Sequence, residues 1–219
     1  MRSFLGRLFA PSWPRSIQPP SVPEWCERMA AHHAMIWWKV NSFVTATVER
    51  VVFQCQCVAY IEKHGIHGAV LECGSGSSTD VVTSALALLA LQSTRRQLYV
   101  HDPLADSVEA AKRALMQTNY PWEKMAFLPA QSDTSTVNYI PDPIALLRVR
   151  ADTAESLTRD FEMLYSRLAD GGIAIVDSAS RNTIDDFAGK QGIADIQNLD
   201  RNSCWFIKRT ATAFIRRAG

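Results

Sequence analysis

The stretch from residue 65 to residue 102, GIHGAVLECGSGSSTDVVTSALALLALQSTRRQLYVHD, decides the fold. Its first apolar run, residues 69–73, contains the carboxylate Glu72 and breaks off at Gly74. A continuous apolar run bounded by glycine is typical of a strand that is buried on both faces, as in a parallel sheet. We therefore expect a parallel strand over residues 69–73.

A glycine-rich turn and a helix follow this strand. Gly74 and Gly76 allow the backbone to turn tightly and to approach a ligand without a Cβ in the way. Four consecutive residues are candidate caps for the helix expected over residues 81–91: Ser77, Ser78, Thr79 and Asp80. A second apolar run, residues 98–100, again leads to a carboxylate, Asp102. Strand, glycine-rich turn, helix, strand and acid together form half of a nucleotide-binding fold.

Three interpretations of this half-unit are open. Any tight strand-to-helix turn favours Gly and Ser, so the pattern can be purely structural. A dinucleotide-binding motif requires a third glycine, and this chain has Thr79 at that position. A short-chain dehydrogenase requires the motif Tyr-x-x-x-Lys, but four residues after Tyr165 this chain has Ala169. The Glu-x-Gly-x-Gly pattern of residues 72–76 better resembles the first motif of S-adenosylmethionine (SAM) methyltransferases. We therefore expect SAM as the cofactor.

Composition and charge limit the class of protein. A chain of 219 residues with 47% apolar and 21% charged residues suits one domain with an N-terminal appendage. A net charge of +1 gives no basic field for nucleic acid. Five cysteines without a C-x-x-C pair indicate reduced thiols and a cytoplasmic protein. The longest apolar runs are shorter than 18 residues, so we expect no membrane-spanning helix.

The chain divides into three parts. Residues 1–23 form an arm with five prolines between positions 11 and 23. Residues 24–64 form a helical cap, with helices expected over 24–40 and 45–63 and with Thr45 or Thr47 as a cap residue. Residues 65–219 form the SAM-binding domain. The aromatic residues of the cap, with His32 and His33, are interpreted either as a lid over a sugar or as a dimer contact.

The rest of the chain alternates strands and helices. After Asp102 we expect a helix over 106–116, capped by Asp106 or Ser107, and strands over 125–128 and 144–149. A helix over 152–168, a turn at 169–172 and a strand over 173–176 are expected next. The chain is then expected to form a short helix around 185–187 and a closing pair of strands over 193–197 and 204–208. This alternation predicts an α/β fold: a Rossmann-like, seven-stranded, mostly parallel sheet with helices on both faces.

Polar residues stand where five of these strands end. They are Glu72, Asp102, Asp133, Arg150 together with Asp152, and Asp177. Ligands of open α/β sheets bind beyond the carboxyl ends of the strands, where the strand order reverses. Five strands that deliver polar groups to one rim therefore predict a functional site there.

Five segments together resemble the macrocin O-methyltransferase family of sugar O-methyltransferases. They are TATVER at 45–50, HGIHGAVLECG at 64–74, QLYVHD at 97–102, IALLRVRADTAES at 144–156 and LYSRLADGGIAIVDS at 164–178. The resemblance implies the class I methyltransferase fold and SAM as methyl donor. It also implies that the turn after residue 73 faces the amino-acid part of SAM and that Asp102 takes the ribose hydroxyls.

The expected cofactor-binding residues follow from the turn and the strand ends. They are Glu72, Gly74, Gly76, Ser77, Ser78, His101, Asp102, Ser132 and Asp133. Glu72 is expected to organise the turn by accepting backbone N–H bonds, and Asp133 to face the adenine amino group. His101 is interpreted either as a general base or as a residue that stacks near adenine.

The chain departs from the family where the family is implied to bind magnesium. The implied ligands are the first Asp after the fourth strand and an Asp-Asp pair after the fifth. Here Arg150 stands in place of the first and Ser178 in place of the last, so Asp152 and Asp177 remain. Mg²⁺ requires hard oxygen ligands, and a guanidinium puts a permanent positive charge where the cation would sit. We expect no metal site and no Mg²⁺.

Methyl transfer needs little from the protein beyond alignment of the acceptor oxygen and removal of its proton. Asp152 and Asp177 are the candidate bases. Arg150 either replaces the metal electrostatically or simply pairs with one of these aspartates and leaves an inert rim.

The expected function is therefore SAM-dependent O-methylation of a sugar or small-molecule hydroxyl without a metal. The alternative is a catalytically degenerate SAM-binding or scaffold homologue in the same pathway. A small-molecule acceptor is the expected partner, nucleic acid is not, and a homodimer is compatible with the sequence.

Overall fold

The computed structural model describes residues 31–42, 46–74, 78–102, 104–128, 139–150, 161–177, 180–191, 193, 196–198 and 204–209. The proline-rich arm over residues 1–23 lies outside these ranges, as do the first residues of the expected helical cap.

Helices and strands alternate through most of the described chain. The helices are α2 (Ala31–Asn41), α3 (Val48–Lys63), α4 (Ser78–Ala90), α5 (Ala105–Met116), the 3-10 helix η2 (Trp122–Lys124) and α7 (Arg181–Gln191). The strands are β1 (Ala69–Cys73), β2 (Leu98–His101), β3 (Met125–Leu128), β4 (Ile144–Arg150), β5 (Leu168–Asp177), β6 (Ile196–Asn198) and β7 (Trp205–Lys208).

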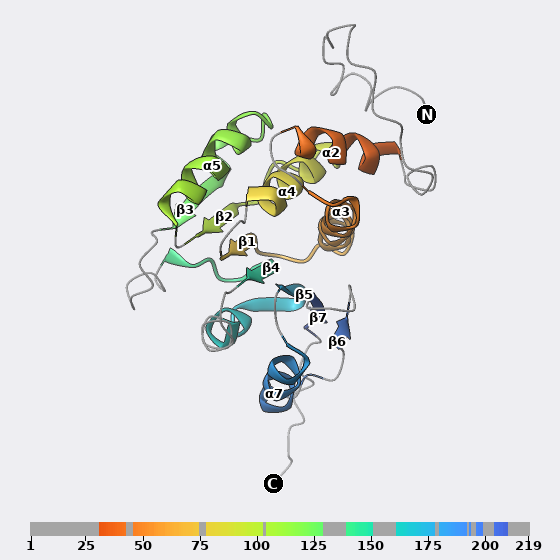
Figure 1. The fold of residues 1–219 in the computed structure, drawn as a ribbon, viewed down its shortest axis with the longest axis vertical. Coiled ribbons are helices and arrows are strands. Elements are labelled where there is room, and N and C mark those ends of the chain that lie inside the picture. The colour runs from red at the N-terminus through yellow and green to blue at the C-terminus, as the bar shows by residue number, and fades with distance from the viewer. Residues whose placement is uncertain are drawn as a thin grey trace, which may run out of the picture.

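The strands form one seven-stranded sheet in the order β3-β2-β1-β4-β5-β7-β6. The first five pair in parallel, whereas β7 is antiparallel to both β5 and β6. The strand order reverses between β1 and β4, so the carboxyl ends of these two strands border the switch point of the sheet. The predicted mostly parallel, Rossmann-like sheet and its closing antiparallel pair are thus confirmed (Figure 1).

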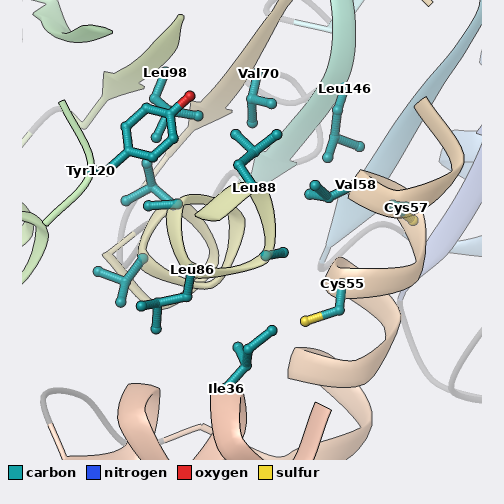
Figure 2. Packing of buried hydrophobic residues seen from close by; sticks show 14 of the residues in the cluster. Ile36, Cys55, Cys57, Val58, Val70, Leu86, Leu88, Leu98, Tyr120 and Leu146 are labelled. Carbon is teal, nitrogen blue, oxygen red and sulfur yellow. The ribbon is translucent and has the colours of Figure 1, made fainter. Parts of the chain in front are cut away.

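Two apolar clusters cover the two faces of the sheet. Neighbouring residues of one strand point to opposite faces, so Leu146 packs in the cluster under α3 and α4, whereas Leu147 packs in the other. Figure 2 shows side chains of α2, α3 and α4 meeting those of β1, β2 and β4. Each fully buried Leu or Ile stabilises the fold by about 1.5–3 kcal/mol. The helices α2 to α5 lie on one side of the strands and α7 on the other (Figure 1).

The helix starts agree with the expected positions only in part, since α4 begins at Ser78 instead of residue 81 and α7 at Arg181 instead of about residue 185. Thr47, one of the two expected caps, is the N-cap of α3, and its Oγ1 accepts from the N–H of Arg50 at 3.4 Å. The cap expected for α5 was wrong, because neither Asp106 nor Ser107 takes that role. The N-cap is Leu104, which makes no side-chain cap bond, and its N–H donates to Asp102 at 2.9 Å.

The structure also corrects the start of β5. Leu168 was expected to close an amphipathic helix and residues 169–172 to form a turn, but β5 begins at Leu168. Of the expected helix, residues 161–165 are helical, and residues 151–160 lie outside the described ranges. Leu168 pairs with Ile144, and Gly171 and Gly172 exchange backbone hydrogen bonds with Arg209 at 2.9 Å. The two glycines therefore extend the strand, because Arg209 supplies partners for their backbone groups.

Gly74 joins the ends of β1, β2 and β4. Its φ is 108°, and its N–H donates to the carbonyl of His101 at 2.8 Å. A Cβ built on Gly74 would overlap the backbone carbonyl of Arg150. Glycine was expected here for close approach to a ligand, but the approach of Arg150 alone already requires it.

Substitution of Gly74 by Ala tests this strand contact. Because the new Cβ overlaps backbone at a left-handed φ, we expect a loss of unfolding free energy of more than about 2 kcal/mol. Gly189 in α7 is the matched control, since a Cβ there meets nothing within 4 Å. Urea unfolding of both variants measures the difference. Equal stability of Gly74→Ala and Gly189→Ala would contradict the prediction.

Candidate active site

The described members of the predicted rim lie at the carboxyl ends of adjacent parallel strands. Arg150 ends β4 and is the register partner of Asp177, which ends β5. Asp102 directly follows β2, and Gly74 directly follows β1. The sheet therefore brings the predicted rim residues Arg150, Asp177 and Asp102 to one edge, and Gly74 lies there with them. Five of the other candidates lie outside the described residues: Gly76, Ser77, Ser132, Asp133 and Asp152.

Arg148, two residues before Arg150, is a buried cation inside the sheet. Its side chain is 5% exposed, and it lies on the same strand face as Leu146, under α3 and α4. Its guanidinium makes a two-pronged contact with Asp177, with Nε 2.8 Å from Oδ2 and Nη2 3.0 Å from Oδ1. Such bidentate pairs fix geometry as well as charge.

Asp80, in the first turn of α4, is the second carboxylate of this network. It is 1% exposed, and Arg148 Nη1 lies 3.2 Å from its Oδ1. Arg50 from α3 donates to the same carboxylate through Nε, at 2.7 Å, and through Nη2. The first turns of α3 and α4 are thus joined by an ion pair above the sheet. Asp80 was expected only as a candidate helix cap.

Gln54 connects the arginines to Glu72. It is completely buried, and its Nε2 donates to Glu72 Oε1 at 2.8 Å and to Ser84 Oγ at 2.9 Å. Its Oε1 accepts from Arg148 Nη1 at 3.0 Å. Burial, and then the charge of Asp80, raises the pKa of Glu72 well above its usual range. Glu72 therefore lies beneath the rim with the side chain of Gln54 as its partner, and its neutral form is favoured.

Asp177 has the opposite electrostatic behaviour. Burial disfavours its charge, but the charge and hydrogen bonds of Arg148, followed by the charge of Arg50, outweigh burial and lower the pKa of Asp177 to about 2. A carboxylate with such a low pKa is a weak proton acceptor near neutral pH. Asp177 is instead suited to bind the positively charged guanidinium groups around it.

The network becomes more exposed toward the rim. Arg150 Nη2 donates to Asp177 Oδ2 at 3.1 Å, and Arg50 Nη2 lies 3.7 Å from the same oxygen. The side chains of Arg150 and Arg50 are 25% and 24% exposed, against 2% for Asp80. The pairing of Arg150 with Asp177, which was expected under the alternative of an inert rim, is present, whereas its pairing with Asp152 lies outside the described residues.

The other described candidates lie near the start of α4 and the end of β2. Ser78 is the first residue of α4 and is half-buried, and His101 is the last residue of β2. Asp102 is completely buried, and one of its oxygens accepts from Leu104. A buried carboxylate at the end of β2, beside the switch point, fits a site that binds ribose hydroxyls.

A metal ion does not fit the donors that the described residues of the rim provide. Asp177 is contacted by three guanidinium groups, and hard divalent cations need several oxygen ligands that are free of such partners. Within the described part of the chain, three or more His, Cys, Asp or Glu residues never gather as a metal site.

The histidines of α2 lie away from this rim. His32 and His33 have ring centroids 4.1 Å apart and line a cavity of about 180 Å³ with Ala87, Ala90 and Leu91, at the end of α4. The rim lies at the other end of that helix. The interpretation of these two histidines as a lid is therefore wrong, and the aromatic residues before position 31 lie outside the described ranges.

Four members of the network were not singled out as site residues: Arg50, Gln54, Asp80 and Arg148. One signal was present in the sequence, because Arg148 interrupts the apolar run 144–149 of a strand predicted to be buried. A cation inside such a strand requires buried partners. The periodicity of the sequence does not indicate which residues are the partners of Arg148.

Comparison with solved structures agrees with the observed fold. The O-methyltransferase NovP superposes with a TM-score of 0.67 at 20% identity, over 77% of this chain and 83% of that one. TomG of Streptomyces achromogenes, an O-methyltransferase solved with SAM, gives 0.59 at 10% identity, over 85% and 94%. An O-methyltransferase of Bacillus cereus, solved with SAH, gives 0.56 at 11% identity, over 84% and 94%. No curated protein matches the chain by sequence.

These likenesses define the fold as that of SAM-dependent methyltransferases. The family model described as Macrocin-O-methyltransferase (TylF) matches residues 104–208, which include β4, β5 and β7. The predicted resemblance to the macrocin O-methyltransferase family is thereby confirmed over this part of the chain. Among the described helices, none is long and apolar enough to span a membrane.

Replacement of Arg148 by Met tests the energetic weight of the network. The variant leaves Asp177 and Gln54 buried without their main partner, so we expect a loss of about 3–5 kcal/mol in unfolding free energy. Arg181→Met is the control, because Arg181 is 70% exposed in its pair with Asp185 and such pairs contribute at most about 1 kcal/mol. Chemical unfolding that gives the two variants the same stability would contradict the account.

The raised pKa of Glu72 predicts a pH-dependent effect of Glu72→Gln. The folded state favours the protonated form, so the contribution of Glu72 is fully present below its ordinary pKa of 4.5 and is lost as pH rises above it. We expect the variant to match the parent at pH 4 and to be more stable at pH 8. Thermal unfolding at both values measures this, with the exposed Glu123→Gln as control. A variant that is less stable at pH 8 would refute the assignment.

Proposed function

We propose that the protein transfers a methyl group from SAM to a hydroxyl of a sugar or similar small molecule without a divalent cation. The observation that carries this proposal is the ion pair between Arg150 and Asp177, 3.1 Å apart at the ends of β4 and β5. At this edge the family resemblance implies carboxylate ligands for magnesium.

The charges of the network support metal independence. Two like unit charges about 4 Å apart repel by about 4 kcal/mol at the effective dielectric constant near a protein surface, and a divalent ion doubles this. A magnesium ion beside Asp177 would meet this repulsion from Arg150, Arg148 and Arg50 together. The attraction of Mg²⁺ to Asp177 would compensate little of this repulsion, because the oxygens of this carboxylate already accept hydrogen bonds from guanidinium groups.

The proposed cofactor residues surround the first turn of the fold. SAM, when bound, supplies a methyl group already activated by its sulfonium. Asp102 would hold the ribose, and Gly74, Gly76, Ser77 and Ser78 would follow the rest of the cofactor from the turn. Ser132 and Asp133 are proposed to face adenine, with His101 beside them. Glu72 is proposed to support the turn from beneath, through its hydrogen bond with Gln54.

The proposed catalytic roles divide between charge and proton transfer. Arg150 would stabilise negative charge that develops on the acceptor oxygen, the electrostatic part that a metal plays elsewhere. Asp177 would hold Arg150 in place, since a pKa of about 2 makes it a poor base. Asp152 is the proposed general base that takes the hydroxyl proton.

Calorimetric titration of SAM, with EDTA and then with excess Mg²⁺, tests this proposal. We expect the same affinity in both buffers and methyl transfer to a hydroxyl acceptor in EDTA. Asp102→Asn is expected to weaken SAM binding about tenfold, a loss of about 1.4 kcal/mol, because a carboxylate accepts two hydroxyl protons better than an amide does.

Three outcomes separate the possibilities. Absence of SAM binding would contradict the proposed function. Binding or transfer that requires Mg²⁺ would contradict the role of Arg150. SAM binding without transfer across a panel of sugar and phenolic acceptors would favour the catalytically degenerate homologue.

A further inference from the structure

Two arginines from distant parts of the chain meet at one oxygen atom. Arg50 on α3 and Arg150 at the end of β4 lie 3.7 and 3.1 Å from Asp177 Oδ2 through their Nη2 atoms. Each side chain is about a quarter exposed, at 24% and 25%. These two guanidinium groups are the exposed end of an otherwise buried network, and we refer to them as the arginine pair.

Two bidentate ion pairs hold the network together. Arg148 binds Asp177 in a bidentate contact, and Arg50 does the same with Asp80. Glu72, the third carboxylate of the network, is the one whose neutral form burial favours. Arg150 adds a third guanidinium group to this network, and it does so at the rim.

We propose that the arginine pair binds an anionic group, a carboxylate or a phosphate, carried by the methyl acceptor. This inference rests on the proposed function and narrows its substrate class to acidic or phosphorylated sugars. Guanidinium groups present planar arrays of donors that match carboxylate and phosphate oxygens. A single carboxylate oxygen, Asp177 Oδ2, already lies within 4 Å of both Nη2 atoms. Because the Nη2 atoms of Arg50 and Arg150 converge on one oxygen of Asp177, the two guanidinium groups are close enough to bind one anionic group of the acceptor together.

Location and exposure support the same assignment. Arg150 is the register partner of Asp177 at the carboxyl end of the sheet, the edge at which open α/β sheets bind ligands. A pair that served only to neutralise Asp177 would not need to be open to solvent, because Arg148 already contacts both oxygens of that carboxylate with a side chain only 5% exposed.

The test is calorimetric titration of three sugars into the full-length chain: D-glucuronate, D-glucose 6-phosphate and the neutral D-glucose. Each titration is made with and without saturating SAH, at 50 and 300 mM NaCl as rough low- and high-salt conditions. We expect both anions to bind more tightly than glucose by tenfold or more, and to weaken with salt. The relative affinity of the carboxylate and the phosphate identifies which group the site prefers.

Variants assign the binding to the arginine pair. Arg150→Gln is expected to remove most of the preference for anions, whereas Arg150→Lys keeps the charge and part of the preference. Arg113→Gln is the matched control, because Arg113 is exposed in the last turn of α5, at the opposite end of the strands. Thermal unfolding verifies that each variant folds, and Arg50→Lys tests the second arginine.

The outcomes are separable from those of the proposed function. Glucose that binds as tightly as glucuronate, or an anion preference that survives Arg150→Gln, overturns the inference. So does SAH binding without binding of either anion. Failure of SAH to bind contradicts the proposed function instead, while the titrations without SAH still decide whether the arginine pair binds anions.

Discussion

The buried guanidinium of Arg148 is the constraint on which the rest of the site depends. A charge removed from water costs several kcal/mol unless it is paired with good geometry. Here the compensation comes from Asp177 on β5, Asp80 on α4 and Gln54 on α3. One cation thereby ties two strands and two helices together directly beneath the switch point of the sheet. Removal of any partner leaves another buried group unsatisfied, so these elements are coupled in stability.

This coupling has a consequence for chemistry. Because Arg148 holds both oxygens of Asp177, that carboxylate is fixed in its ionised form and its pKa falls to about 2. It then serves as an anchor for Arg150 and Arg50, which reach the rim. A position that the family resemblance assigns to a metal ligand thus carries a cation of the protein's own. A guanidinium provides positive charge without requiring an oxygen-rich cage, which is the simplest physical account of the altered rim.

Much of the fold follows from local sequence signals. The apolar run that became β1 was predicted, and Thr47 was one of two predicted caps, because each depends on residues close in sequence. The start of β5 at Leu168 was not, since its pairing with Ile144 and the bonds to Arg209 are tertiary. The rim could be predicted because parallel strands end at one edge. The partners of Arg148 could not, because Gln54 is 94 residues away and periodicity does not specify which helix covers which strand.

In the proposed site the arginines take the place of a metal ion, and this replacement can be tested by the binding of Mn²⁺. Electron paramagnetic resonance distinguishes free hydrated Mn²⁺ from Mn²⁺ bound to protein, and Mn²⁺ occupies oxygen-ligand sites that suit Mg²⁺. For the full-length chain saturated with SAH, we expect added Mn²⁺ to retain its free signal. Loss of one equivalent of that signal per chain, reversed by Asp177→Asn, would contradict it.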